Sequence, residues 1–281
     1  MATQILCVVG PTASGKSARA VVEALARGGE VISVDSRQVY RGLDIGTEKI
    51  SREEMRDVPH HLIDIREVSE PYSAADFAED AARLIVEISA RGKLPILVGG
   101  TSFYFDALLR PLIAETRPDP LLRAQLEARS NHELYMEIQE TDPRRARELD
   151  PMNRRRLIRA LEIIETHGHV PERQGHNDTY DTEWIILDLS REELRSRIDA
   201  RLEKAFTRGL VEEVKRVAER ISVEGLNELG LEYRIVGEYL RGERNEDSMF
   251  PALSAKLWQY ARRQKAWLRK LTVEYSITAA Q

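Results

Sequence analysis

Cysteine is nearly absent from this sequence: Cys7 is the single one in 281 residues, and it lies inside an apolar run. One cysteine forms neither an intrachain disulfide nor a cysteine-rich metal site. The sequence also lacks any uninterrupted run of about 18 apolar residues, and its first residues show no basic stretch followed by an apolar segment. We therefore expect a cytoplasmic protein that is neither secreted nor embedded in a membrane.

An overall excess of positive charge is missing as well. The formal net charge is -5 at pH 7 and the isoelectric point is near 5.8. These values exclude a globally basic, histone-like coat for nucleic acid, although local basic surfaces remain possible. With 42% apolar residues, the chain is long enough to form one large domain, or a core with a smaller appendage.

What the sequence does contain is a complete phosphate-binding loop between an apolar run and an amphipathic helical pattern. The helix N-terminus adds about half a positive charge to the inward-pointing backbone amides. Lys16 adds a full charge, and Ser17 puts a hydroxyl where a Mg²⁺ ion bridging two phosphates needs an oxygen ligand. The loop predicts polyphosphate binding without identifying what the phosphates carry. Its eight residues are Gly10, Pro11, Thr12, Ala13, Ser14, Gly15, Lys16 and Ser17.

Short apolar runs alternate with helical patterns through the first third of the chain, and we expect strands over 31–34, 62–65 and 96–98 and a later one over 184–189. This alternation predicts an α/β fold with a doubly wound parallel sheet that contains the phosphate loop. Between the two parts of this core the pattern is helical, with three Asp-Pro pairs as helix starts. We therefore expect a discontinuous catalytic core over 1–116 and 184–281, with a helical insertion domain over 117–183.

Positive charge is concentrated in two windows. Residues 144–159 contain seven arginines against two acids, and residues 256–270 contain six lysines and arginines and no acid. On a helix, Arg155, Arg156 and Arg159 share one side, opposite a set of leucines and isoleucines. A solvated surface with ion pairs is the alternative explanation. Because the charge is concentrated rather than spread, we favour a polyanionic second substrate of the nucleic-acid kind.

Further polar residues follow the predicted strands. Asp35 comes directly after the strand over 31–34, where a catalytic base or a metal ligand would lie, and a turn aspartate is the alternative. Thr101 follows a glycine pair that lets the backbone approach a ligand closely, unless the glycines are purely conformational. His60 and His61 are adjacent on an extended segment and point in opposite directions, so we expect no transition-metal site there.

Taken together, these motifs resemble the tRNA dimethylallyltransferase family, over nearly the whole chain and in the same order. The lone cysteine and the lack of the zinc finger of eukaryotic relatives resemble the bacterial type. Position 37 is a departure, because the family often has an apolar residue where this chain has Arg37. Besides the phosphate loop, the resemblance is carried by residues 35–49, 59–65, 98–101, 150–163, 209–214 and 263–267.

The resemblance implies transfer of a dimethylallyl group from dimethylallyl diphosphate to the N6 amine of the adenosine 3′ to the tRNA anticodon, with diphosphate as the leaving group. It implies Mg²⁺ as cofactor and the anticodon stem-loop as partner, and we expect a monomer. The implied catalytic residues are Lys16 and Ser17 at the diphosphate, Asp35 as proton acceptor and Thr101 as an aligning group.

The resemblance also implies contacts to each substrate. Arg197 or Arg201 would clamp the diphosphate, and the adenine would be flipped out of its stack to reach the pocket. The implied tRNA contacts are Asp35, Ser36, Arg37, Gln38, Thr101, Arg123, Arg155, Arg156, Leu157, Ile158 and Arg159.

Three alternative functions remain open. A small-molecule kinase would use the loop for ATP and would need a closing lid where this chain has a basic helical insertion. An adenylate isopentenyltransferase, acting on free nucleotide, would give the arginines of the insertion nothing to bind. A non-catalytic RNA-binding module would not need Lys16, Ser17 and Asp35 at one edge of a sheet.

Overall fold

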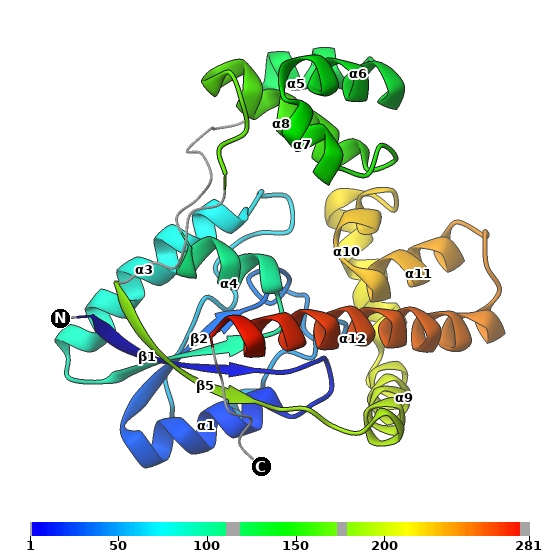
Figure 1. Cartoon of the computed structure of the whole chain (residues 1–281). Helices are drawn as coiled ribbons and strands as arrows, with labels where there is room; N and C mark the ends of the chain where they lie inside the picture. Colours follow the sequence, from blue (N-terminus) through cyan, green and yellow to red (C-terminus); the bar gives the residue numbers. More distant parts are fainter. Residues whose placement is uncertain (1, 111–118, 173–178, 276–281) are drawn as a thin grey trace. The chain divides into compact units, whose positions relative to one another are not determined.

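The computed structural model describes residues 2–110, 119–172 and 179–275 (Figure 1). The chain forms two compact units, one made of residues 1–109 with 178–281 and the other of residues 110–177. The larger unit contains the phosphate loop and the whole sheet, whereas the described residues of the smaller unit form helices and turns. None of the helices in the described ranges is both long enough and apolar enough to span a bilayer.

A five-stranded parallel sheet in the order β3-β2-β4-β1-β5 forms the centre of the larger unit. This confirms the predicted α/β class. Every residue of β2 is buried, as expected for an inner strand of a sheet covered on both faces. The strands are β1 (Thr3–Val9), β2 (Gly29–Val34), β3 (His60–His61), β4 (Leu94–Gly99) and β5 (Tyr180–Ile186).

Two of the predicted strands are displaced. The strand expected over 62–65 is wrong, since β3 comprises only His60–His61. Leu62 and Asp64 have positive φ angles of 60° and 56°, which end the extended backbone at that point. The strand expected over 184–189 begins earlier, at Tyr180, and ends at Ile186.

Helices cover both faces of the sheet. Leu6 and Val8 of β1 pack with α1 (Lys16–Arg27) on one face. The alternating residues Ile5, Cys7 and Val9 pack on the other face with α3 (Ala74–Ala90), α4 (Ser102–Leu109) and the end of α12 (Met249–Glu274) (Figure 1). This alternation is the period of two that a strand imposes, and it makes the sheet doubly wound as predicted.

The remaining elements of the larger unit build a second hydrophobic core beside the sheet. It contains Val39 and Leu43 from the loop after β2, together with apolar residues of the helices that follow β5. This core fixes the segments that surround the carboxyl ends of the strands. The helices that build it are α9 (Arg191–Thr207), α10 (Leu210–Ile221), η1 (Gly225–Glu228), α11 (Leu231–Leu240) and the first part of α12. The short helices α2 (Arg52–Met55) and η2 (Glu246–Ser248) complete this unit.

Two of the three Asp-Pro pairs begin helices in the smaller unit as predicted, with Asp119 and Asp142 as side-chain caps. The third prediction, at Asp150, is wrong. The side chain of Asp150 accepts from the backbone N–H of Met152 in a local turn, and Asn153 caps the helix instead. The helices are α5 (Pro120–Glu127), α6 (Asn131–Thr141), α7 (Pro143–Glu148) and α8 (Arg154–His167).

Candidate functional site

The phosphate loop connects β1 to α1 and curves through left-handed backbone positions. Gly15 caps α1 with a φ of 89°, and Ala13 has a φ of 62°. A Cβ on Gly10 would lie 2.6 Å from the Ser14 hydroxyl and 2.8 Å from the Leu187 carbonyl, so only glycine fits there. The buried Ser14 hydroxyl has no hydrogen-bond partner among the described residues. A loop that leaves a buried donor unused in this way is suited to an anionic ligand.

The side chain of Lys16 folds back toward the start of this loop. Its Nζ donates to the Pro11 carbonyl at 2.7 Å. Burial, and then the nearby charge of Arg201, lower the pKa of Lys16 to about 8, against an opposing effect of Asp35. Because desolvation destabilises the ammonium charge, an anion bound beside it would be strongly favoured.

Helix α9 brings two predicted arginines to the same loop. Arg201 donates from Nη1 to the Thr12 hydroxyl at 2.6 Å, across 189 positions of sequence. Arg197 lies one turn earlier, and its Nη1 is 3.7 Å from where a Cβ on Gly15 would be. It also pairs with Glu193 at 2.8 Å. Both guanidinium groups therefore lie close enough to contact a phosphate held by the loop.

Asp35 directly follows β2 and lies beside the loop. Its Oδ1 accepts from the backbone N–H groups of Arg37 at 2.8 Å and Gln38 at 3.2 Å. Asp35 therefore has the turn-forming role considered as the alternative, while its Oδ2 takes part in neither bond. Thr101 precedes α4, and its carbonyl accepts from the backbone amides of Tyr104 and Phe105 in that helix. A carboxylate whose second oxygen lies outside these two turn bonds can still accept a proton.

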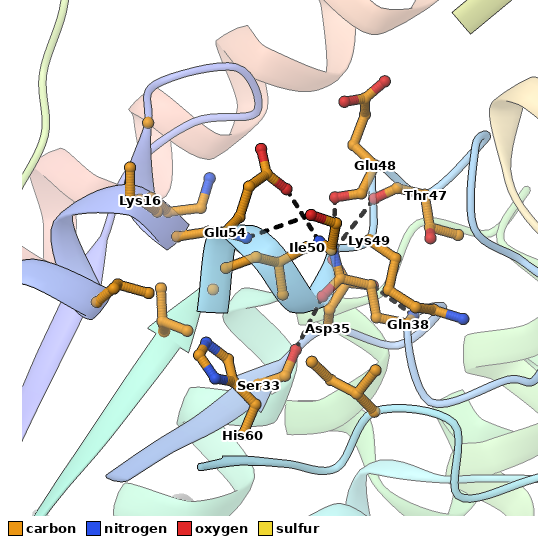
Figure 2. A pocket seen from close by; sticks show the side chains of 18 of the residues that line it. Lys16, Ser33, Asp35, Gln38, Thr47, Glu48, Lys49, Ile50, Glu54 and His60 are labelled. Atoms are coloured by element: carbon orange, nitrogen blue, oxygen red, sulfur yellow. Dashed lines mark hydrogen bonds between the residues drawn. The ribbon is translucent and has the colours of Figure 1, made fainter. Parts of the chain in front are cut away.

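Two cavities meet at these residues. The first, which we call the loop cavity, has a volume of about 510 Å³ and is lined by the phosphate loop, residues 47–51 and residues at the ends of the strands, among them Ser33 and His60 (Figure 2). The second, the edge cavity, has about 230 Å³ and is lined by Ser36, Arg37, Thr101 and residues 229–233. Both are lined by Thr12, Asp35, Thr47 and Arg201.

The two adjacent histidines point in different directions, as expected for neighbours on extended backbone. His61 lies within 2.7 Å of Glu30, whereas His60 lines the loop cavity, where burial lowers its pKa (Figure 2). In the parts of the chain that the structure describes, no three His, Cys, Asp or Glu side chains cluster as metal ligands. Ser17 lines the loop cavity, where the loop motif predicts a magnesium ligand.

Gln264 on α12 is a site residue to which sequence reasoning assigned no role. Its Oε1 accepts from the Thr12 amide at 2.8 Å, and its Nε2 donates to the Gly100 carbonyl at 3.1 Å. One side chain thus joins the phosphate loop to the turn that carries Thr101. A buried amide on the apolar face of a helix was the signal for this role, although nothing in the sequence identifies its partners.

Glu213 on α10 is a second such residue. Its buried carboxylate accepts from the amides of Asp44, Ile45 and Gly46 at 3.0, 2.7 and 2.9 Å, and from the Tyr233 hydroxyl at 2.7 Å. These four bonds hold the turn that brings Thr47 to the junction of the cavities. The sequence signal was a carboxylate on the buried face of α10, between apolar residues.

In the smaller unit, the predicted RNA contacts separate into two groups. Arg155 and Arg156 are exposed on α8, whereas the side chains of Leu157 and Ile158 are buried in the core of the unit. Their side chains therefore belong to the core, and the contact of these two residues with RNA stays a prediction. Arg123 and Arg159 both pair with the buried carboxylate of Glu162, at 2.8 and 3.1 Å, and so compensate a charge that would otherwise be buried without a partner.

Comparisons with known proteins agree on one family. The model of the IPP transferase family matches residues 38–271. The chain is 44% identical to the tRNA dimethylallyltransferase of Thermomicrobium roseum, covering 95% of this chain and 84% of the relative. It is 40% identical to that of Halalkalibacterium halodurans, covering 96% and 89%.

Solved structures support the same assignment. A full-length tRNA isopentenylpyrophosphate transferase from Bacillus halodurans is similar with a TM-score of 0.70 and 39% identity, over 95% of this chain and 87% of that one. A eukaryotic dimethylallyltransferase acting on tRNA is similar with a TM-score of 0.83 and 28% identity, over 95% and 70%. The chain belongs to the IPP transferase family.

Proposed function

We propose that this protein transfers a dimethylallyl group from dimethylallyl diphosphate to the N6 amine of the adenosine 3′ to a tRNA anticodon, releasing diphosphate. The observation that carries the proposal is the junction of the two cavities at Thr12, Asp35, Thr47 and Arg201. The loop cavity contains the phosphate loop, and the edge cavity lies on the other side of Asp35. Two substrates that enter from the two cavities meet beside a carboxylate.

The diphosphate of the donor occupies the phosphate loop in this proposal. The loop amides, Lys16, Arg197 and Arg201 surround it with positive charge, which stabilises the leaving group as the carbon–oxygen bond breaks. Ser17 is the residue that would hold Mg²⁺, and a hydroxyl oxygen suits that ion. When bound, the ion neutralises part of the diphosphate charge.

The adenine occupies the edge cavity. Its N6 amine attacks the allylic carbon, the carbon–oxygen bond breaks, and the amine proton passes to Asp35. Thr101 lies in the same cavity, where its hydroxyl aligns the base. Because a stacked adenine cannot enter a cavity of this kind, the nucleotide has to be flipped out, at a cost of a few kcal/mol.

Phosphate contacts offset that cost. In the larger unit, α12 has a row of cations on the side opposite its buried face, and these side chains are exposed. In the smaller unit, Arg155 and Arg156 are exposed on α8. An RNA backbone suits both surfaces, since each neutralised phosphate releases counterions. The exposed cations of α12 are Lys256, Arg262, Arg263, Arg269 and Lys270.

The experiment that tests this function supplies the protein with dimethylallyl diphosphate, Mg²⁺ and tRNA and analyses the digested nucleosides by mass. We expect prenylated adenosine from tRNA and none from adenosine monophosphate. Modification of the free nucleotide without tRNA would favour the adenylate isopentenyltransferase alternative. Consumption of ATP without prenyl transfer would favour a kinase.

A further inference from the structure

A carboxylate without an assigned role faces the candidate site. Glu232 lies in the first turn of α11 and lines the edge cavity together with Asp35 and Thr101. Its side chain is 14% exposed, and burial raises its pKa. A carboxylate in such a position needs a nearby cation to remain charged.

That cation is Arg201. Its Nη2 lies 3.6 Å from Glu232 Oε1, whereas its Nη1 donates to the Thr12 hydroxyl at 2.6 Å. The 3.6 Å between Nη2 and Glu232 is longer than a hydrogen bond. Nη2 is therefore held by charge attraction to Glu232 and not by a hydrogen bond to it. Arg201 lines both cavities, and Glu232 lines the edge cavity.

A phosphate oxygen is a better partner for this arm than Glu232 is. Guanidinium groups bind phosphate through two parallel hydrogen bonds, and a diphosphate carries more than one negative charge. The carboxylate also repels an anion that is bound in the phosphate loop, because both lie close to the same guanidinium.

We propose that Glu232 is the resident counter-ion of Arg201, which a diphosphate in the phosphate loop displaces. This inference rests on the proposed function in one respect: it takes diphosphate as the anion that binds in the phosphate loop. In the free protein, Glu232 balances Arg201. When the diphosphate binds, Arg201 changes partner, and Glu232 lowers the affinity for the anion and so favours release of the product.

The test measures binding of inorganic diphosphate, with Mg²⁺ present, to the full-length protein by calorimetry. Glu232→Gln removes the charge and keeps the shape. We expect it to bind diphosphate about tenfold more tightly than the wild type does, because Arg201 no longer has to leave an ion pair and the anion no longer meets a negative charge beside it. Glu232→Asp keeps the charge and should bind like the wild type. The matched control is Glu238→Gln, because Glu238 lies on the same helix and pairs with Arg244 at 2.7 Å.

A double variant separates exchange of partners from general repulsion. In an Arg201→Ala background, Glu232→Gln should tighten diphosphate binding by clearly less than it does with Arg201 present, because only the direct repulsion between the carboxylate and the anion remains. Equal gains in the two backgrounds would show that Glu232 acts by general repulsion and would overturn the exchange of partners. Weaker diphosphate binding by Glu232→Gln would overturn the proposal and show that Glu232 positions Arg201. Equal affinities in the wild type and Glu232→Gln, with thermal unfolding showing that both are folded, would also overturn it.

Failure of the proposed function is distinguishable from failure of this inference. If the wild type prenylates no tRNA and Glu232→Gln still binds diphosphate more tightly, the counter-ion role stands and the assigned reaction is wrong. If the wild type prenylates tRNA and Glu232→Gln binds diphosphate no more tightly, the reaction stands and the counter-ion role is wrong.

Discussion

Replacing Glu213 by glutamine should both destabilise the larger unit and slow the reaction. The carboxylate accepts four hydrogen bonds, two at each oxygen. Glutamine keeps one acceptor oxygen and turns an NH₂ group toward at least one backbone N–H. Hydrogen bonds to charged groups contribute about 1.5–3 kcal/mol each, so the loss of two gives a destabilisation of roughly 3–6 kcal/mol.

For a chain of this size we expect the midpoint of thermal unfolding to fall by about 2–4 °C per kcal/mol, or roughly 6–24 °C in total. The turn over 44–47 should also loosen, and the turnover number should fall because this turn carries Thr47 to the cavity junction. The control is Glu219→Gln on the same helix, where the side chain is exposed. A midpoint for Glu213→Gln within about 1 °C of the control would refute this reasoning.

Three further predictions concern the site. Asp35→Ala should bind tRNA nearly normally and lose about 10²–10⁴-fold in turnover, because it removes the proton acceptor; steady-state kinetics with wild-type turnover would contradict that role. Arg156→Ala should weaken tRNA binding and reduce its logarithmic salt slope by about one, with the affinity for dimethylallyl diphosphate unchanged; filter binding over a salt series checks both. The affinity of the free protein for diphosphate should fall as pH rises through about 8, the pKa to which burial lowers Lys16, because only the ammonium form attracts the anion. In Lys16→Arg this pH dependence should be weaker than in the wild type, and an unchanged profile would show that another group causes it.

The phosphate loop and the parallel sheet could be predicted because their patterns are local. A short apolar run, a glycine-rich turn and an amphipathic helix lie within the first 27 residues. The displaced strand at 62–65 could not be found in this way. Its end depends on positive φ angles at Leu62 and Asp64, which are not glycines.

The contacts that complete the site are long-range, and local patterns do not encode them. Gln264 reaches Thr12 across 252 positions, and Glu213 reaches the turn over 44–46 across about 168. In both cases a polar residue on a buried helix face indicated a partner without identifying it. Leu157 and Ile158 show a different limitation. The family motif was carried over as a continuous stretch of helix, and such a stretch includes residues whose side chains face the core.

The most direct test of the account uses dimethylallyl diphosphate labelled in both the allyl group and the diphosphate. With purified protein, tRNA and Mg²⁺, we predict that the allyl label appears in tRNA adenosine and that one free diphosphate is released for each group transferred. Release of diphosphate without any allyl label in the tRNA, or consumption of ATP with the donor untouched, would contradict the claim that the phosphate loop stabilises a departing diphosphate.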